Sequence, residues 1–180
     1  MLPSFVRVLC LFCFCFSLNA QSLIVEKDRV GWVEWVQFAA HLKLKAKLDS
    51  GAKTSSLDAR EVELFSKGGE SWVRFQLVYK SKKNQLLRKA YERPLVRKVK
   101  IKRHGSASQR RPVVAMDFCF NGRMHRTEFS LVTRSQFIYP ILLGRDFLAD
   151  WVMIDPGETY IAARCDGVSA ISRNQQTVAL

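Results

Sequence analysis

The stretch KLDSGAKTSS, residues 47–56, places an acidic side chain among turn-forming residues. Asp49 ends a run in which apolar and basic residues alternate, and Ser50 and Gly51 follow it at once. This order predicts a strand that ends in a tight turn and presents a carboxylate in a polar backbone setting. Thr54 and Ser55 would then continue into another extended segment. A carboxylate held in this way is suited to act as a general base on water.

The same stretch has a second interpretation, because Lys53-Thr54 resembles the end of a phosphate-binding loop. Such a loop needs a Gly, four residues, and then Gly-Lys-Ser/Thr. Here Ala52 precedes Lys53, Lys47 stands where the first Gly belongs, and no amphipathic helix follows. These departures argue against nucleotide binding, and no cofactor is predicted.

Metal binding is also not indicated by the spacing of histidines. His41, His104 and His125 are isolated from one another, and no pair has ligand spacing. We therefore predict no metal site and expect each to be an ordinary surface or strand histidine.

The rest of the chain reads mainly as strands. Alternating or β-branched runs occupy 31–38, 41–49, 71–79 and 111–120, and Asn121-Gly122 is typical of a hairpin turn. Residues 139–156 predict a strand, a Gly, one helical turn and another strand, and 159–165 would be the last strand. Long helical periodicity is missing, so the fold class is predicted to be all-β.

The length of the chain and the pattern of its residues predict how it is organised into segments. It has 180 residues and a formal net charge of +13. Residues 1–20 have the layout of a secretory signal peptide with cleavage near Ala20, which predicts a periplasmic or secreted protein. One domain would follow over 21–170, with a flexible tail at 171–180. No other apolar segment is long enough to span a membrane.

The net charge and the predicted export together limit the classes of partner that the protein is expected to bind. A strongly basic protein attracts acidic partners, and export disfavours nucleic acid among them. Of the five cysteines, Cys119 and Cys165 lie outside the leader. They permit one disulfide in an oxidising compartment, and two separate thiols is the alternative.

A second motif gives the first one a context. ILLGRDFL, residues 141–148, sets apolar residues before a Gly and Arg-Asp after it. Together with the Asp-Ser-Gly-Ala stretch it resembles the retropepsin fold of aspartic peptidases. EWVQF, KLKAKLDSGAKTSSLDA, RRPVV and TRSQFIYPILLGRDFL, in this order, resemble the bacterial retropepsin-like family that has carried the label ATP-dependent zinc protease.

The resemblance implies a closed retropepsin-like β-barrel with one short helix and an aspartic endopeptidase activity. It implies that Asp49 is catalytic. It also implies a set of residues that support the catalytic loop, namely Ser50, Gly51, Ala52, Thr54, Leu143 and Gly144.

Carboxylate-driven peptide hydrolysis needs two acids that share one proton, because two like charges a few ångströms apart do not both persist. The chain has a single Asp-Ser-Gly, so the resemblance implies a homodimer in which the two Asp49 side chains meet at a two-fold axis. An acid of the same chain is the alternative, and Asp146, Asp150 and Asp155 are the candidates.

Retropepsins close a hairpin flap over the substrate. SKGGES around Gly68-Gly69 and RHGSASQ around Gly105 are the two candidate flaps, and we favour Gly105. Retroviral enzymes usually have an acid at the position of Lys53, so Arg145 loses its expected partner. Lys53 and Arg145 would then bind substrate carboxylates, which with the basic 80–111 region predicts acidic peptides as substrate. Alternatively, Arg145 pairs with Asp58, Asp146 or Glu61.

The predicted function is therefore a secreted aspartic endopeptidase that acts on peptides or proteins. The alternative is a non-catalytic basic module on the same fold that holds an anionic polymer or an acidic protein segment. A metal-dependent hydrolase is a third class, which loss of activity with a chelator would reveal.

Overall fold

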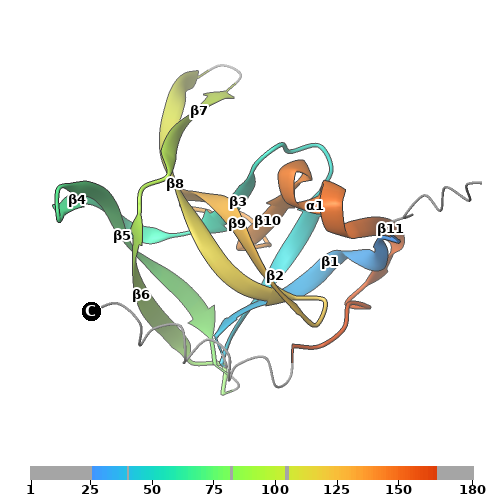
Figure 1. The fold of residues 1–180 in the computed structure, drawn as a ribbon. Helices are drawn as coiled ribbons and strands as arrows, with labels where there is room; N and C mark the ends of the chain where they lie inside the picture. Colours follow the sequence, from blue (N-terminus) through green and yellow to red (C-terminus); the bar gives the residue numbers. More distant parts are fainter. Residues whose placement is uncertain (1–25, 40, 82, 104–105, 166–180) are drawn as a thin grey trace, which may run out of the picture.

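The structure is a computed structural model that describes residues 26–39, 41–81, 83–103 and 106–165. The predicted leader, the tail and Gly105 lie outside these ranges. The described residues form strands and one short helix (Figure 1). The strands are β1 (Asp28–Ala39), β2 (Leu42–Asp49), β3 (Ser55–Asp58), β4 (Arg60–Lys67), β5 (Glu70–Lys80), β6 (Leu86–Pro94), β7 (Arg97–Arg103), β8 (Ser106–Phe120), β9 (Arg123–Val132), β10 (Ile141–Gly144) and β11 (Val152–Thr159), and the helix is α1 (Arg145–Trp151).

Six strands close into a barrel in the order β1-β2-β10-β3-β9-β8. The pairing of Gln37 in β1 with Cys119 in β8 closes it. β11 adds to β1 in parallel, and β7 adds to β8 in an antiparallel hairpin. The prediction of an all-β retropepsin-like barrel with one short helix is confirmed.

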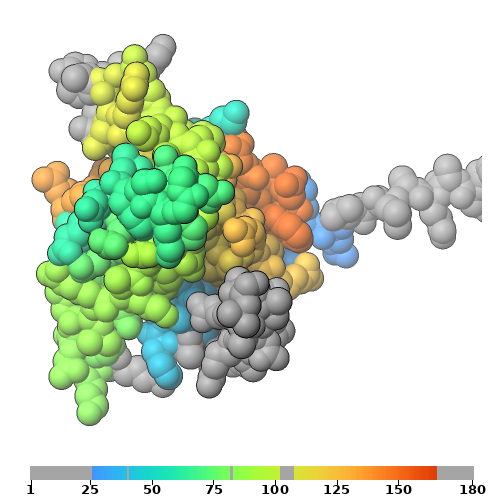
Figure 2. All heavy atoms as spheres, turned by 60° about the vertical axis from the view of Figure 1, so that its left-hand side comes forward, coloured from blue at the N-terminus to red at the C-terminus, as the bar shows by residue number. Residues whose placement is uncertain are grey.

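A second sheet of three strands, β4-β5-β6, lies outside this barrel order. In the space-filling view it covers one face of the molecule (Figure 2). Gly68 and Gly69 form the β4–β5 turn with φ of +60° and +80°, which explains why glycine occupies both positions. The pattern over residues 71–79 predicts the strand β5. No pattern in the sequence indicates that β4, β5 and β6 form a sheet of their own.

The barrel core follows from the alternation seen in the sequence. In β2, Leu42, Leu44, Ala46 and Leu48 are buried, whereas Lys43 and Lys45 are exposed. Burial of such side chains is the main favourable term in folding. The strand that ends at Asp49 is thereby fixed in register, because a shift by one residue would bury lysines.

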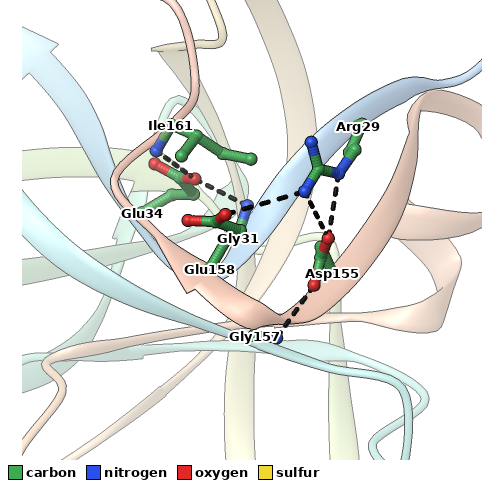
Figure 3. Close-up of polar contacts among 7 residues, drawn as sticks. All are labelled: Arg29, Gly31, Glu34, Asp155, Gly157, Glu158 and Ile161. Atoms are coloured by element: carbon green, nitrogen blue, oxygen red, sulfur yellow. Dashed lines mark hydrogen bonds and ion pairs between the residues drawn. The ribbon is translucent and has the colours of Figure 1, made fainter.

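The segment after β11 corrects the prediction of a last strand over 159–165. Thr159 ends β11, and Tyr160 has a φ of 57°, which takes the chain out of the extended conformation. The buried carboxylate of Glu34 then accepts a hydrogen bond from the backbone N–H of Ile161 (Figure 3). It also accepts one from the backbone N–H of Ala162. The backbone N–H groups of this segment therefore bond to side-chain oxygens and not to a neighbouring strand.

Two further contacts hold this segment. Cys119 and Cys165 form a disulfide with their Cα atoms 6.0 Å apart, which settles the alternative left open above. The side-chain oxygen of Asn121 accepts a hydrogen bond from Ala163 N at 2.8 Å. Asn121 has a φ of 48° in the predicted β8–β9 turn, so the turn also anchors the end of the described chain.

His125 in β9 is buried among aromatic rings that include Phe147 and Trp151 of α1. Its Nε2 lies 3.2 Å from the carbonyl of Phe120, so the neutral ring carries its proton on Nε2. Nδ1 is buried without a hydrogen-bond partner among the described residues. Burial lowers the pKa of His125 below its ordinary value, and Arg123 adds to this effect, while the Phe120 carbonyl and Asp28 oppose it.

This arrangement predicts an acid-sensitive fold. Below pH about 6.5 the unfolded chain takes up a proton on His125 that the folded chain resists, so stability is lost as the pH falls through the folded pKa. The slope from this one group is at most about 1.4 kcal/mol per pH unit. We expect His125→Phe to flatten the fall of Tm between about pH 6.5 and 5. The exposed His41 provides the control. If His41→Gln flattens the fall of Tm with pH as much as His125→Phe does, then the fall is not due to His125.

Candidate active site

Asp49 is the last residue of β2 and lies beside Gly144 in the parallel pairing of β2 with β10. Its Oδ1 accepts a hydrogen bond from Gly51 N at 3.0 Å. Its Oδ2 lies 3.6 Å from the Lys47 ammonium, and the side chain is 26% exposed. The carboxylate is thus oriented by the turn, paired with a nearby cation and still open to a substrate, as a general base requires.

The first residues of α1 hold the loop that follows Asp49. Arg145 N donates to the carbonyl of Ala52 at 2.9 Å, and Asp146 N donates to the carbonyl of Lys53 at 3.0 Å. The first backbone N–H groups of a helix have no acceptor within the helix. Here the loop carbonyls supply these acceptors, so the helix and the loop fix one another.

Gly144 and Ser55 make the contact between β10 and the loop. Gly144 N donates to Ser55 Oγ at 3.0 Å. A Cβ at Gly144 would lie 2.6 Å from the carbonyl oxygen of Lys53 and 2.8 Å from the carbonyl carbon of Thr54. Close approach of the backbones therefore requires glycine at this position. Leu143, the preceding residue, is buried and pairs with Leu48.

The side chain of Arg145 binds the loop that follows Asp49, which the sequence did not predict. Its Nη1 donates to the carbonyls of Ser50 at 2.7 Å and Gly51 at 3.0 Å. None of the three carboxylate pairings considered for it forms in the described residues; Asp58, for example, pairs with Arg60. Lys53 is exposed. Substrate binding by Lys53 and Arg145 stays a prediction, with Arg145 already committed to the loop.

An open hollow of about 770 Å³ lies next to Asp49. Its polar wall consists of Lys47, Asp49, Ser50 and Arg145, and α1 and β11 contribute an apolar side that includes Leu148, Val152 and Met153. Trp32 of β1 also lines it. The carboxylate therefore lies at the edge of a mainly apolar hollow.

The family of the chain can be stated from this geometry and one comparison. The family model described as retropepsin-like aspartic endopeptidase RimB matches residues 29–165. The chain belongs to this RimB-like family. The resemblance drawn from the two motifs is thereby confirmed, since both motifs lie within the matched range.

Relatives agree over the same part of the chain. Proteins named probable alpha-L-glutamate ligase from Shewanella pealeana and Desulfotalea psychrophila are both 32% identical over 75% and 73% of this chain. The chain spans only 30% and 29% of their lengths. The crystal structure of a Legionella pneumophila protein of unknown function is 32% identical, covers 76% of this chain and 99% of its own, and has a TM-score of 0.64.

No hydrogen bond or ion pair joins Asp49 to a second carboxyl group within the described part of the chain. Hydrogen bonds and ion pairs bring only Gly51 and Lys47 to the Asp49 side chain there. Asp146 lines a separate, smaller hollow with Thr54 and Ser55. Asp155 binds Arg29 at 2.6 Å, and this contact, together with Gly157 N, lowers the pKa of Asp155 (Figure 3).

The two candidate flaps differ in their relation to the barrel. β7 and β8 belong to the sheet that carries Asp49, and their hairpin projects from the barrel (Figure 1). The hairpin around Gly68-Gly69 belongs to the separate three-stranded sheet. This topology agrees with our preference for the hairpin around Gly105, although Gly105 itself lies outside the described residues. A role as a flap stays a prediction.

Arg134, between β9 and β10, was not singled out by the sequence analysis. Its guanidinium donates to Ser56 Oγ at 3.0 Å and to the carbonyl of Tyr139 at 3.1 Å. Burial lowers the pKa of Arg134, and the charges of Asp58 and Asp49 oppose this effect. A lone basic residue in TRSQFIYP has no spacing that marks it, because the parallel pairing of β3 with β9 is what brings it to Ser56.

Two further properties concern the described residues as a whole. They contain no helix of the length and apolarity that a membrane crossing needs. They also contain no cluster of three or more His, Cys, Asp or Glu side chains able to hold a metal ion.

Proposed function

We propose that this protein is an aspartic endopeptidase that cleaves acidic peptides, with glutamate-rich segments as the preferred class. The observation that carries the proposal is the Asp49 carboxylate at the end of β2, oriented by Gly51 N beside an open hollow. Membership of a retropepsin-like aspartic endopeptidase family supports the reaction class.

In the proposed mechanism, two carboxylates share one proton. The ionised carboxylate takes a proton from a water molecule as that water attacks the scissile carbonyl carbon. The protonated carboxylate donates a hydrogen bond to the carbonyl oxygen, and a proton then passes to the leaving amine. The Lys47 ammonium lies 3.6 Å from Asp49 Oδ2, so a cation stands beside this carboxylate.

The second carboxylate is proposed to come from Asp49 of another copy of the chain. The apolar side of the hollow next to Asp49 supports this, because Met153, which lines it, is 62% exposed. Exposed apolar patches beside a functional group often form protein interfaces. A two-fold axis through this surface would place the two Asp49 residues face to face.

The acidic preference has two supports. The chain carries a net charge of +13, which raises the local concentration of acidic peptides. Relatives that contain a matching segment are named probable alpha-L-glutamate ligase. A peptidase domain joined to such a ligase domain would meet glutamate-containing chains, so we propose glutamate-rich peptides as substrate.

We also propose that the protein is exported. The N-terminal leader pattern supports this, and so does the Cys119–Cys165 disulfide, since disulfides persist in oxidising compartments.

The proposal is tested with the purified protein and two peptides of equal length, one glutamate-rich and one lysine-rich. We expect the glutamate-rich peptide to be cleaved at least about 10-fold faster at low salt, with the difference shrinking as salt is added. A chelator should leave the rate unchanged. Equal rates would end the acidic preference, and tight binding of the acidic peptide without cleavage would identify a binding module instead. Sedimentation of the same sample tests the homodimer.

A further inference from the structure

Arg134 lies between β9 and β10, and its guanidinium has no carboxylate in direct contact among the described residues. Its guanidinium bonds to two neutral oxygens, Ser56 Oγ and the Tyr139 carbonyl. The carboxylate of Asp58 has other partners: its Oδ1 accepts from the backbone N of Arg134 at 2.6 Å, and its Oδ2 pairs with Arg60 at 3.1 Å. In the described part of the chain, no ion pair forms to the Arg134 guanidinium.

The geometry of this side chain is also fixed. Nε and Nη1 are held by the two neutral oxygens, and the ring of Phe137 lies 4.5 Å from the guanidinium carbon. Nη2 makes no hydrogen bond to the described residues. A guanidinium held in one plane with a spare N–H is pre-organised for a carboxylate, which accepts along defined directions.

Arg134 contacts Ser56, and the strand pairing of Ser56 places both residues at the end of the barrel that carries Asp49. Ser56 pairs with Leu142, which pairs in turn with Lys47, and Leu142 is two positions from Gly144. The charge of Asp49 is one of those that oppose the lowering of the pKa of Arg134 by burial. A side chain bound at Arg134 would therefore belong to a residue close to the scissile bond in an extended substrate.

The other cations at the site have different partners. Arg145 is bonded to the carbonyls of Ser50 and Gly51, and Lys47 faces Asp49 itself. Lys53 is exposed, and a mobile ammonium of this kind selects charge without fixing a position.

We infer that Arg134 and Ser56 form a subsite that binds the side-chain carboxylate of an acidic substrate residue next to the scissile bond. The inference rests on the proposed function, since it assigns the acidic preference of that site to one residue.

The experiment compares two peptides that differ at one position near the cleaved bond, Glu in one and Gln in the other. Wild-type protein should prefer the Glu peptide in kcat/KM. Arg134→Gln should reduce kcat/KM for the Glu peptide by about 10- to 100-fold, because one charge-assisted interaction is lost, and should leave the Gln peptide nearly unchanged. Arg134→Lys keeps the charge without the planar fork and should recover only part of the preference.

Arg126→Gln is the matched control. Arg126 is an exposed arginine that pairs with Asp117 on the outside of β8 and β9, so this variant removes the same charge away from the site. The ratio of the two peptides should be that of wild type. An unchanged ratio in Arg134→Gln, or an equal loss for both peptides, would overturn the inference.

Binding separates this inference from the proposed function. In an Asp49→Asn background, the Kd values of the Glu and Gln peptides are measured with and without Arg134→Gln at about 0.15 M salt, where distant charges are screened. A preference for Glu that disappears with Arg134→Gln supports the subsite even if wild-type protein cleaves neither peptide, which would refute the peptidase activity alone. Equal Kd values for the two peptides before Arg134 is changed would refute the subsite.

Discussion

Asp49→Asn should abolish peptide hydrolysis, with kcat lower by at least about 10³-fold, because an amide cannot take a proton from water. The fold should survive, since the side-chain oxygen of Asn can still accept the hydrogen bond from Gly51 N that orients the loop. The measurements are peptide cleavage and Tm on the same preparation. Full activity in Asp49→Asn would remove this residue from the mechanism.

Two companion variants locate the second acid. Asp117→Asn removes an exposed carboxylate that pairs with Arg126 and should leave activity unchanged. Asp146→Asn tests the alternative of a partner in the same chain, and activity close to wild type would leave the symmetric pair as the explanation. Mixing Asp49→Asn with wild-type protein should inhibit the wild type, because mixed dimers hold one catalytic carboxylate.

Gly144→Ala should inactivate the protein without touching a reacting group. The added Cβ would lie 2.6 Å from the Lys53 carbonyl oxygen, which is part of the backbone and cannot rotate away. We expect a loss of about 2–4 kcal/mol in the free energy of unfolding. A displaced Asp49 loop should also lower kcat/KM by about 100-fold in the molecules that remain folded. Denaturant unfolding and peptide cleavage check the two effects separately.

Gly122→Ala is the control for this prediction. Gly122 has a φ of +70°, and the nearest atom to an added Cβ is 3.5 Å away, so the substitution strains the backbone without a clash. It should cost about 1 kcal/mol and leave activity intact. If Gly144→Ala is no more damaging than Gly122→Ala, then the close approach of β10 to the loop is not required.

Sequence reasoning reached the fold class and the loop around Asp49 because both depend on local patterns. The alternation over β2 specifies which face is buried, and Asn121-Gly122 specifies a turn, whatever the rest of the chain does. The Gly144 motif was recognised through its resemblance to the second motif of the retropepsin fold.

Features that depend on contacts between distant segments were not predicted, because no local pattern in the sequence indicates such contacts. Glu34 lies in an apparently alternating strand and was expected among its polar residues, yet it is 1% exposed and accepts three backbone N–H groups. Those of Ile161 and Ala162 arrive from the far end of the chain. Arg134 owes its setting to the parallel pairing of β3 with β9, which no short window of sequence can show.

The arrangement of β1 and β11 has a consequence for biosynthesis. The first strand of the described fold is completed by the last, with Asp28 beside Val152, and residues 144–146 supply the contacts that hold the Asp49 loop from outside. A nascent chain that ends before this point holds Asp49 on a turn without these contacts. If the proposed activity holds, the chain could not hydrolyse peptides until residues 144–146 had been synthesised and had folded against the loop.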